Sequence, residues 1–378
     1  MSNINLSEIK VIKIDIIFKG GLMERNSLMI SVEKDWEKFL LIPISEKLQY
    51  FSRDGRIYDC LFAQQLDRDI LTHLFKVADV LRKITKNKEG MRFANGLMSH
   101  KRSMLYFVQP STRTFLSFLN ACHILGIKTG EIRDTSISSE LKGETPEDSV
   151  RTFSSYVDLI IMRHPLPNFV EKSAWLMNKT KRPVPIINGG SGKDQHPTQA
   201  LLDIYTLYRS FNGEIDGKTI AMVGDLKRGR TVRSLSYLMK NYRNMKLIYI
   251  SPKEFAMEKD ILDFLKRHNI SYYETDNFEE GIREADAIYM TRIQDEHDKN
   301  GESNKVDISA FCLNGNHLNK IKKDSIIMHP LPRRQEISVE VDDDPRAMYW
   351  RQERNGMWVR AALISYIFGC DEDLLKYK

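Results

Sequence analysis

The sequence contains few cysteines, and no two of them are close together. The four are Cys60, Cys122, Cys312 and Cys370, in a chain of 378 residues, and they form no Cys-x-x-Cys pair. Zinc sites and disulfide frameworks need cysteines at short or regular spacings. We therefore expect no metal site and no disulfide framework, and a reducing compartment, the cytoplasm, as the location.

Long apolar runs are missing as well. We find no segment that is long and apolar enough to span a bilayer. The first ten residues, MSNINLSEIK, lack the basic start and the apolar stretch of a secretory signal. We expect no association with a membrane.

The chain also lacks a large excess of one charge. It has 57 Lys and Arg against 51 Asp and Glu, which gives a formal net charge of +6, and the excess is spread along the sequence without a long basic block. Nucleic-acid binding usually needs clustered basic residues. The mild positive balance favours small anionic ligands instead, and we expect no nucleic-acid partner.

Short apolar segments alternate with segments of helical period from residue 68 onward, which is the pattern of parallel sheets covered by helices on both faces. The number of these units is too large for one compact sheet. We therefore predict an α/β fold with two doubly wound parallel-sheet domains. The expected strands lie within residues 103–108, 158–163, 183–188, 218–225, 245–251, 286–292 and 325–332.

The break between the two domains is expected near residues 189–199, where Gly189, Gly190 and Gly192 indicate a bend. We predict a first domain over 61–197, to which a final amphipathic helix returns within 355–372, and a second domain over 198–354. Residues 1–60 form an N-terminal extension of unknown role. It carries two strand-like runs, at 11–20 and 37–51, and no chemical motif.

The stretch PSTRT, residues 110–114, lies between a strand-like run and a helix-like run. Pro110 ends the strand and Ser111 is a good N-cap, so the next amides are unpaired at the first turn of a helix. Such a turn attracts anions, and Arg113 adds a fork that matches phosphate or carboxylate. Ordinary capping is the alternative, but capping needs Ser111 alone.

Polar side chains recur at the carboxyl ends of the predicted strands, where open α/β sheets bind their ligands. Capping of strand ends would explain some of them, and surface ion pairs would explain single arginines. Neither explanation accounts well for cationic and amide side chains that recur after strands in both halves of the chain. These residues are Arg163 and His164; His196 and Gln199; Lys227, Arg228 and Arg230; Arg292 and Gln294; and the run HPLPRRQE, residues 329–336.

Two apparent nucleotide-binding motifs have the wrong residue types at the positions that define them. GGSGKD resembles a phosphate-binding P-loop, but Asp194 stands where Ser or Thr is needed and Ile187 where Gly is needed. VGDLKRGR follows a strand as a dinucleotide fingerprint does, yet charged side chains occupy the glycine positions. We set both nucleotide readings aside.

Six motifs together resemble the aspartate and ornithine carbamoyltransferase family, in the same order and over about residues 62 to 369. They are PSTRT, MRHP, HPTQALLDIYTL, GDLKRGRTVRSL, TRIQ and HPLPRRQE. Ornithine enzymes typically have a cysteine in the HPxQ and HxLP segments, where this chain has Thr198 and Pro330. The resemblance therefore favours the aspartate branch. It implies transfer of a carbamoyl group from carbamoyl phosphate to L-aspartate for pyrimidine synthesis, with no cofactor, a carbamoyl-phosphate domain in the first half and an aspartate domain in the second.

The resemblance also implies roles for individual residues. The phosphate would be held by Ser111, Thr112, Arg113 and Thr114, and the carbamoyl oxygen would be polarised by Thr114, Arg163 and His196. Gln199 and the backbone of Leu331 and Pro332 would bind the carbamoyl amide. The aspartate carboxylates would be bound by Arg230, Arg292 and Gln294.

Residues 136–149 resemble the family loop that enters a neighbouring subunit's site, and by themselves they read as a polar surface loop before a helix. By that resemblance Ser138 and Lys142 would serve an adjacent site in a homotrimer with shared active sites. A regulatory chain is left open. Two rival readings are a carbamoyltransferase with another acceptor, ornithine or an N-acylated amino acid, and a non-catalytic scaffold of the same fold.

The chain departs from the family pattern directly after STRT. Phe115 and Leu119 replace a basic and an acidic residue that would pair along the helix. We expect an apolar contact in place of the ion pair, which affects packing more than chemistry.

Overall fold

The computed structural model describes residues 32–134, 143–192, 195–294 and 309–377. The chain divides into two compact units, Met1–Lys47 and Leu48–Lys378. No helix in the described ranges is both long and apolar enough to cross a membrane.

The first unit is helical where the structure describes it. Residues 32–40 form a helix, and α2 (Ile44–Tyr50) begins after Pro43. The strand predicted over 37–51 is therefore wrong, because the apolar residues follow a helical period: the rings of Trp36 and Phe39 are three residues apart and stack with their centroids 5.8 Å apart. The strand predicted over 11–20 lies outside the described residues.

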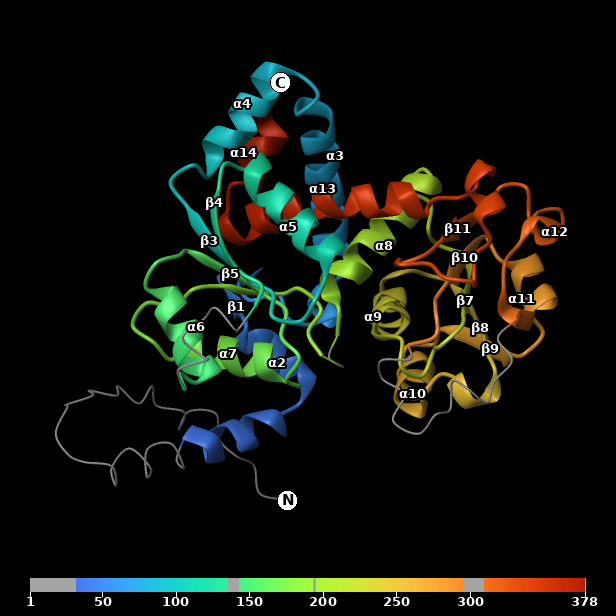
Figure 1. Ribbon diagram of the computed structural model, residues 1–378, viewed down its shortest axis with the longest axis horizontal. Helices are drawn as coiled ribbons and strands as arrows, with labels where there is room; N and C mark the ends of the chain where they lie inside the picture. Colours follow the sequence, from blue (N-terminus) through green and yellow to red (C-terminus); the bar gives the residue numbers. More distant parts are fainter. Residues whose placement is uncertain (1–31, 135–142, 193–194, 295–308, 378) are drawn as a thin grey trace. The chain divides into compact units, whose positions relative to one another are not determined.

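Two parallel sheets form the second unit, which confirms the predicted fold class (Figure 1). The first sheet has the order β4-β3-β5-β6, with β3 (Arg102–Tyr106), β4 (Lys128–Ile132), β5 (Leu159–Met162) and β6 (Ile186–Asn188). The second has the order β11-β10-β7-β8-β9, with β7 (Thr219–Val223), β8 (Lys246–Ile250), β9 (Ser271–Thr275), β10 (Ala287–Met290) and β11 (Ile326–Met328). A short antiparallel pair, β1 (Ser52–Arg53) and β2 (Arg56–Ile57), precedes them.

Helices cover both faces of each sheet. Around the first sheet lie α3 (Arg68–Ile84), α4 (Lys88–Leu97), α5 (Thr112–Ile124), α6 (Pro146–Ser154) and α7 (Phe169–Asn178). Around the second lie α9 (Arg230–Leu238), α10 (Lys259–Arg267), α11 (Phe278–Glu284) and α12 (Gly315–Leu318). Between the sheets, α8 (Pro197–Ser210) packs against α9. Successive residues of the central strands point to opposite faces, so Ile220 and Met222 join one apolar cluster while Ala221 and Val223 join another.

All seven predicted strands are present, but β4 and β9 were not predicted. Both are edge strands, and their side chains are largely solvent-exposed or half-buried. An edge strand is not buried on both faces and so need not be apolar. Their sequences, KTGEI and SYYET, accordingly lack the apolar run that indicated the other strands.

The long helix α13 (Tyr349–Phe368) packs against α3, α5 and α8, as the sequence predicts for a returning final helix. It also contacts β11 of the second sheet. The residue bounds that we assign to the two domains stay a prediction.

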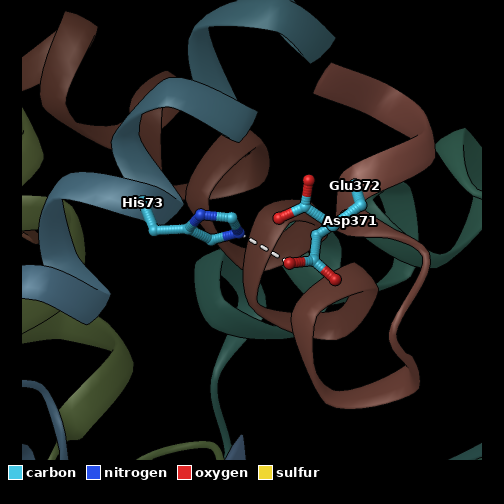
Figure 2. Close-up of side chains that lie close together, drawn as sticks. All are labelled: His73, Asp371 and Glu372. Carbon is cyan, nitrogen blue, oxygen red and sulfur yellow. Dashed lines mark hydrogen bonds and ion pairs between the residues drawn. The ribbon is translucent and has the colours of Figure 1, made fainter. Parts of the chain in front are cut away.

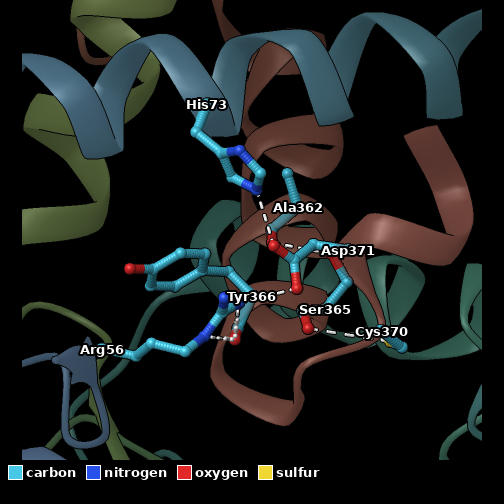
Figure 3. A network of polar contacts seen from close by, with 7 residues as sticks. All are labelled: Arg56, His73, Ala362, Ser365, Tyr366, Cys370 and Asp371. Atoms are coloured by element: carbon cyan, nitrogen blue, oxygen red, sulfur yellow. Dashed lines mark hydrogen bonds and ion pairs between the residues drawn. The ribbon is translucent and has the colours of Figure 1, made fainter. Parts of the chain in front are cut away.

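A buried carboxylate ties the last helix, α14 (Asp371–Lys376), to earlier parts of the chain (Figure 3). Asp371 is fully buried; its Oδ1 accepts from Arg56 Nη2 at 2.7 Å, and its Oδ2 lies 2.6 Å from His73 Nε2. Arg56 also donates to the carbonyl oxygen of Tyr366 at 2.7 Å. His73, Asp371 and Glu372 are potential metal ligands that lie close together (Figure 2), but the guanidinium on Asp371 already supplies the positive charge. We interpret the cluster as an ion-pair network.

Replacing Asp371 by asparagine should lower the free energy of unfolding by about 1–2 kcal/mol, because the Arg56 guanidinium loses its anion and His73 loses its carboxylate partner, while both side chains stay partly hydrated. Chemical denaturation of the variant measures this. Glu372→Gln is the matched control, since it removes an exposed neighbouring carboxylate and should change stability little. An Asp371→Asn protein as stable as the wild type would contradict the structural role of the network.

Candidate active site

The first turn of α5 contains the STRT residues. Ser111 occupies the N-cap position with extended backbone, φ −164° and ψ 106°, and its side chain makes no capping hydrogen bond. Thr114 is buried, whereas Thr112 is exposed. The hydroxyl of Ser111 is thus not used to cap the helix, and the anion site at this turn stays a prediction.

Four predicted arginines lie close enough to act on one another. Burial, and then the charges of Arg230, Arg113 and Arg360 in that order of effect, together lower the pKa of Arg163 to about 9. Burial also lowers the pKa of Arg113, and Arg292 contributes to this lowering. These side chains come from α5, the ends of β5 and β10, and α9, so the fold gathers positive charge from distant parts of the sequence. A group of mutually repelling cations is suited to bind anions.

His196 is a buried histidine at the N-cap position of α8. Burial, and then the charges of Arg230 and Arg163, hold its pKa well below the ordinary value, so the ring is neutral at physiological pH. Its backbone N–H donates to Ser234 Oγ at 3.0 Å, and its Nδ1 has no hydrogen-bond partner among the described residues. The ring also lies against Gly190, where an added Cβ would be 2.4 Å from His196 Cδ2. His196 is therefore a cap residue whose neutral ring lies within electrostatic reach of Arg230 and Arg163.

Gln199, one turn into α8, is oriented by Asp203. Its Nε2 donates to Asp203 Oδ1 at 2.9 Å, and the same carboxylate accepts from Tyr289 at 2.8 Å and Gln352 at 2.7 Å. Burial raises the pKa of Asp203 to about 7 against these hydrogen bonds. With its nitrogen held by Asp203, Gln199 has its amide oxygen left to accept from a ligand.

The loops after β7 and β10 are joined by Asp225. This buried carboxylate accepts from Arg228 Nε at 2.8 Å and from the backbone N–H of Gln294 at 3.2 Å. Arg292 Nη1 donates to the carbonyl of Ile293 at 3.0 Å, and Arg230 Nη1 donates to the carbonyl of Gly192. Because β7 and β10 are neighbours in the sheet, the predicted acceptor-side residues lie at adjacent strand ends.

The loop after β11 contains Leu331 and Pro332. Leu331 has φ 54°, its peptide bond to Pro332 is cis, and its N–H donates to His329 Nδ1 at 2.7 Å. His329 Nε2 lies 2.8 Å from Glu336 Oε1. Burial lowers the pKa of His329, and the charges of Arg113 and Arg292 act in the same direction. This loop therefore faces the cationic cluster.

Comparison with known proteins identifies the arrangement. The carbamoyl-P binding domain of aspartate/ornithine carbamoyltransferases matches residues 59–209, and the Asp/Orn binding domain of the same enzymes matches residues 216–367. This chain belongs to the aspartate/ornithine carbamoyltransferase family.

The relatives of this carbamoyltransferase-family chain include aspartate enzymes. It is 42% identical to aspartate carbamoyltransferase 2, chloroplastic, of Pisum sativum, over 82% of this chain and 78% of that protein. It is also similar to the structure of aspartate transcarbamoylase from Trypanosoma cruzi in complex with carbamoyl phosphate and aspartate, with a TM-score of 0.73 and 33% identity over 81% of this chain and 95% of that one. The structure of the Trypanosoma cruzi enzyme in complex with N-(phosphonacetyl)-L-aspartic acid gives a TM-score of 0.71 and 32% identity, over 81% of this chain and 94% of that one.

Not every predicted residue of this family member can be placed. Ser138 and Lys142 lie outside the described residues. His164, at the end of β5, packs against Phe169 with ring centroids 4.3 Å apart, and its Nδ1 accepts from the N–H of Leu166. We therefore assign His164 a structural role. Phe115 lies edge-on to Phe107 with centroids 5.6 Å apart, and Leu119 packs on the same apolar core.

Two charged residues near the family motifs were not predicted from the sequence. Arg360 on α13 is 1% exposed and donates to Ser117 Oγ at 2.6 Å, and burial lowers its pKa to about 10. Gly356 leaves room for it, since an added Cβ there would be 2.6 Å from Arg360 Nη1. The second, Glu353, forms an ion pair with Arg113. An arginine inside the apolar run MWVRAAL was a signal for the first, but Glu353 lies in the polar stretch RQER and gave none.

Proposed function

We propose that this chain is an aspartate carbamoyltransferase, which transfers the carbamoyl group of carbamoyl phosphate to L-aspartate and releases N-carbamoyl-L-aspartate and phosphate. The observation that carries the proposal is a chain of neighbouring cations beside a neutral, buried histidine: Arg163 and Arg230 act on His196, Arg113 acts on Arg163, and Arg292 acts on Arg113. Both substrates are anions, and the two substrates together carry several negative charges that such a cluster can neutralise. The pea and Trypanosoma cruzi relatives support the aspartate acceptor.

The reaction needs donors where negative charge develops. The amine nitrogen of aspartate attacks the carbamoyl carbon and loses a proton, and the carbon–oxygen bond to phosphate breaks with its electron pair leaving on the phosphate. During attack the carbamoyl oxygen becomes negative. We assign Thr114, Arg163 and the neutral ring of His196 as donors to that oxygen, and Arg113 with the first turn of α5 as the site of the departing phosphate; the burial and mutual influence of these charged groups support the assignment.

The choice of acceptor depends on Arg230, Arg292 and Gln294. Two guanidinium groups favour an acceptor with two carboxylates, because each fork matches a carboxylate with two hydrogen bonds. A cationic side chain such as that of ornithine would be repelled. The arginines therefore support aspartate over ornithine or an N-acylated amino acid.

We further propose a homotrimer in which Ser138 and Lys142 enter the neighbouring subunit's site, a cytoplasmic location and a role in pyrimidine biosynthesis. The family resemblance supports the shared site and the pathway. The separated cysteines, free in the described chain, support a reducing compartment. A regulatory chain stays open, and sizing the protein in solution with and without a bisubstrate analogue tests the assembly.

The activity is tested by supplying carbamoyl phosphate with L-aspartate and measuring carbamoyl-aspartate and phosphate. Ornithine and N-acetylornithine are supplied in parallel. We expect equal amounts of the two products with aspartate and none above background with the other acceptors. Product formed with ornithine but not with aspartate would favour the carbamoyltransferase with another acceptor. If no product formed with any of the three acceptors, the non-catalytic scaffold would be favoured.

A further inference from the structure

Glu353 places a carboxylate beside the arginine assigned to the phosphate. Its Oε1 lies 3.8 Å from Arg113 Nε, across the packed helices α13 and α5. The side chain of Glu353 is 23% exposed and that of Arg113 is 39% exposed, so solvent and ligands can reach the pair. The separation is longer than a hydrogen bond, so Glu353 attracts Arg113 by charge without fixing the orientation of the guanidinium.

Glu353 has a second cation on its own helix. Arg360 lies seven residues further along α13, on the same face of the helix. Burial raises the pKa of Glu353, and the charges of Arg360 and then Arg113 oppose that rise. On α5 the partners of these two residues, Arg113 and Ser117, are one helical turn apart. Glu353 can therefore lose Arg113 and still be stabilised by Arg360.

A negative charge at this position acts against an incoming anion. Other charged groups that interact with the pair include Arg292 and Arg163, both coupled to Arg113, and Asp203 on α8, whose pKa is raised in part by Glu353. A phosphate on Arg113 would add two negative charges next to the Glu353 carboxylate. Because like charges at short distance repel, ligand binding and the Arg113–Glu353 pair compete.

We propose that Glu353 is a displaceable internal counter-ion of Arg113: it neutralises this arginine while the phosphate position is empty, and it weakens phosphate binding so that the product can leave. This inference rests on the proposed function, which assigns Arg113 to the phosphate. When phosphate takes Arg113, Glu353 is left with Arg360. In this proposal Glu353 sets the affinity for the phosphate group. It contacts neither the attacking amine nitrogen nor the carbamoyl carbon.

The test is the affinity for inorganic phosphate, measured by calorimetry at about pH 8, where phosphate is largely a dianion. Glu353→Gln keeps the shape and removes the charge, and we expect it to bind phosphate about three- to tenfold more tightly than the wild type. Glu353→Asp keeps the charge and should return the affinity toward the wild-type value. Glu279→Gln removes one distant exposed carboxylate and controls for net charge.

A cycle with Arg113 separates the proposed role from a general effect. In an Arg113→Ala background, Glu353→Gln should change phosphate affinity less than in the wild-type background, because the group with which it competes is gone. Weaker or unchanged phosphate binding by Glu353→Gln would overturn the inference. The proposed function would still stand in that case if the wild-type protein makes carbamoyl-aspartate and binds phosphate. If the wild-type protein binds no phosphate, both the proposed function and the role of Glu353 are wrong.

Discussion

Replacing His196 by alanine should lower the turnover number about 10²- to 10³-fold, with a smaller change in the KM for carbamoyl phosphate. The reason is the state of the ring. Burial and the neighbouring Arg230 and Arg163 hold its pKa well below the ordinary value, so the ring is neutral, and in the proposed function it donates a hydrogen bond to the carbonyl oxygen that becomes negative. Such a donor stabilises the transition state more than the bound substrate, and its loss is therefore expected in kcat.

The pH profile gives an independent check on His196. A group whose pKa lies well below its ordinary value stays neutral across the physiological range, so His196 should contribute no acid-side step between about pH 6 and pH 9. The matched control is His268→Ala, at the exposed end of α10, which should keep wild-type kinetics. A His196→Ala enzyme with unchanged kcat and a raised KM would limit His196 to ground-state binding.

Replacing Arg113 by alanine should weaken carbamoyl phosphate binding by about 2 to 5 kcal/mol, nearer the lower value because the side chain is only partly buried. Arg113 combines a full positive charge with the free donors at the start of α5, so its removal takes away the charge and leaves the helix terminus. Equilibrium binding of carbamoyl phosphate, or its KM with aspartate held saturating, measures the loss.

Two variants make the Arg113 result specific. Arg113→Lys keeps the charge but loses the planar fork, and we expect an intermediate affinity. Arg209→Ala removes an arginine that pairs with Asp79 on the surface and should leave binding unchanged. If Arg113→Ala altered the KM for aspartate more than that for carbamoyl phosphate, the assignment of Arg113 to the phosphate would be wrong.

The apolar strands of both sheets were predictable from the sequence, whereas the two polar edge strands were not. Buried parallel strands must be apolar on both faces, so β5, β7 and β10 are readable as short apolar runs. The edge strands β4 and β9 face water and are held by pairing with β3 and β8, which no local pattern encodes. The segment 37–51 shows the opposite error, because an apolar run of that length suits either a strand or a helix.

Candidate site residues were easiest to choose where they follow a strand. Arg163 and Arg292 come one and two residues after β5 and β10, and Arg230 begins α9, the helix that follows β7; parallel strands bring their ends to one edge of each sheet. Arg360, Glu353 and Asp203 lie within helices, where the sequence reads them as ordinary helical positions. Their placement depends on how α13 packs against α5 and α8, a tertiary contact between segments more than 100 residues apart.

The packing of α13 has a consequence for how the enzyme matures. Gln352 on this helix donates to Asp203 and accepts the N–H of His329, so a single amide, translated late, links α8 to the loop after β11. A nascent chain halted before residue 349 would lack that link and the Arg360 guanidinium, although every strand of both sheets would already have been synthesised. Catalytic competence should therefore appear only after α13 has been translated, when every strand of both sheets is already part of the nascent chain.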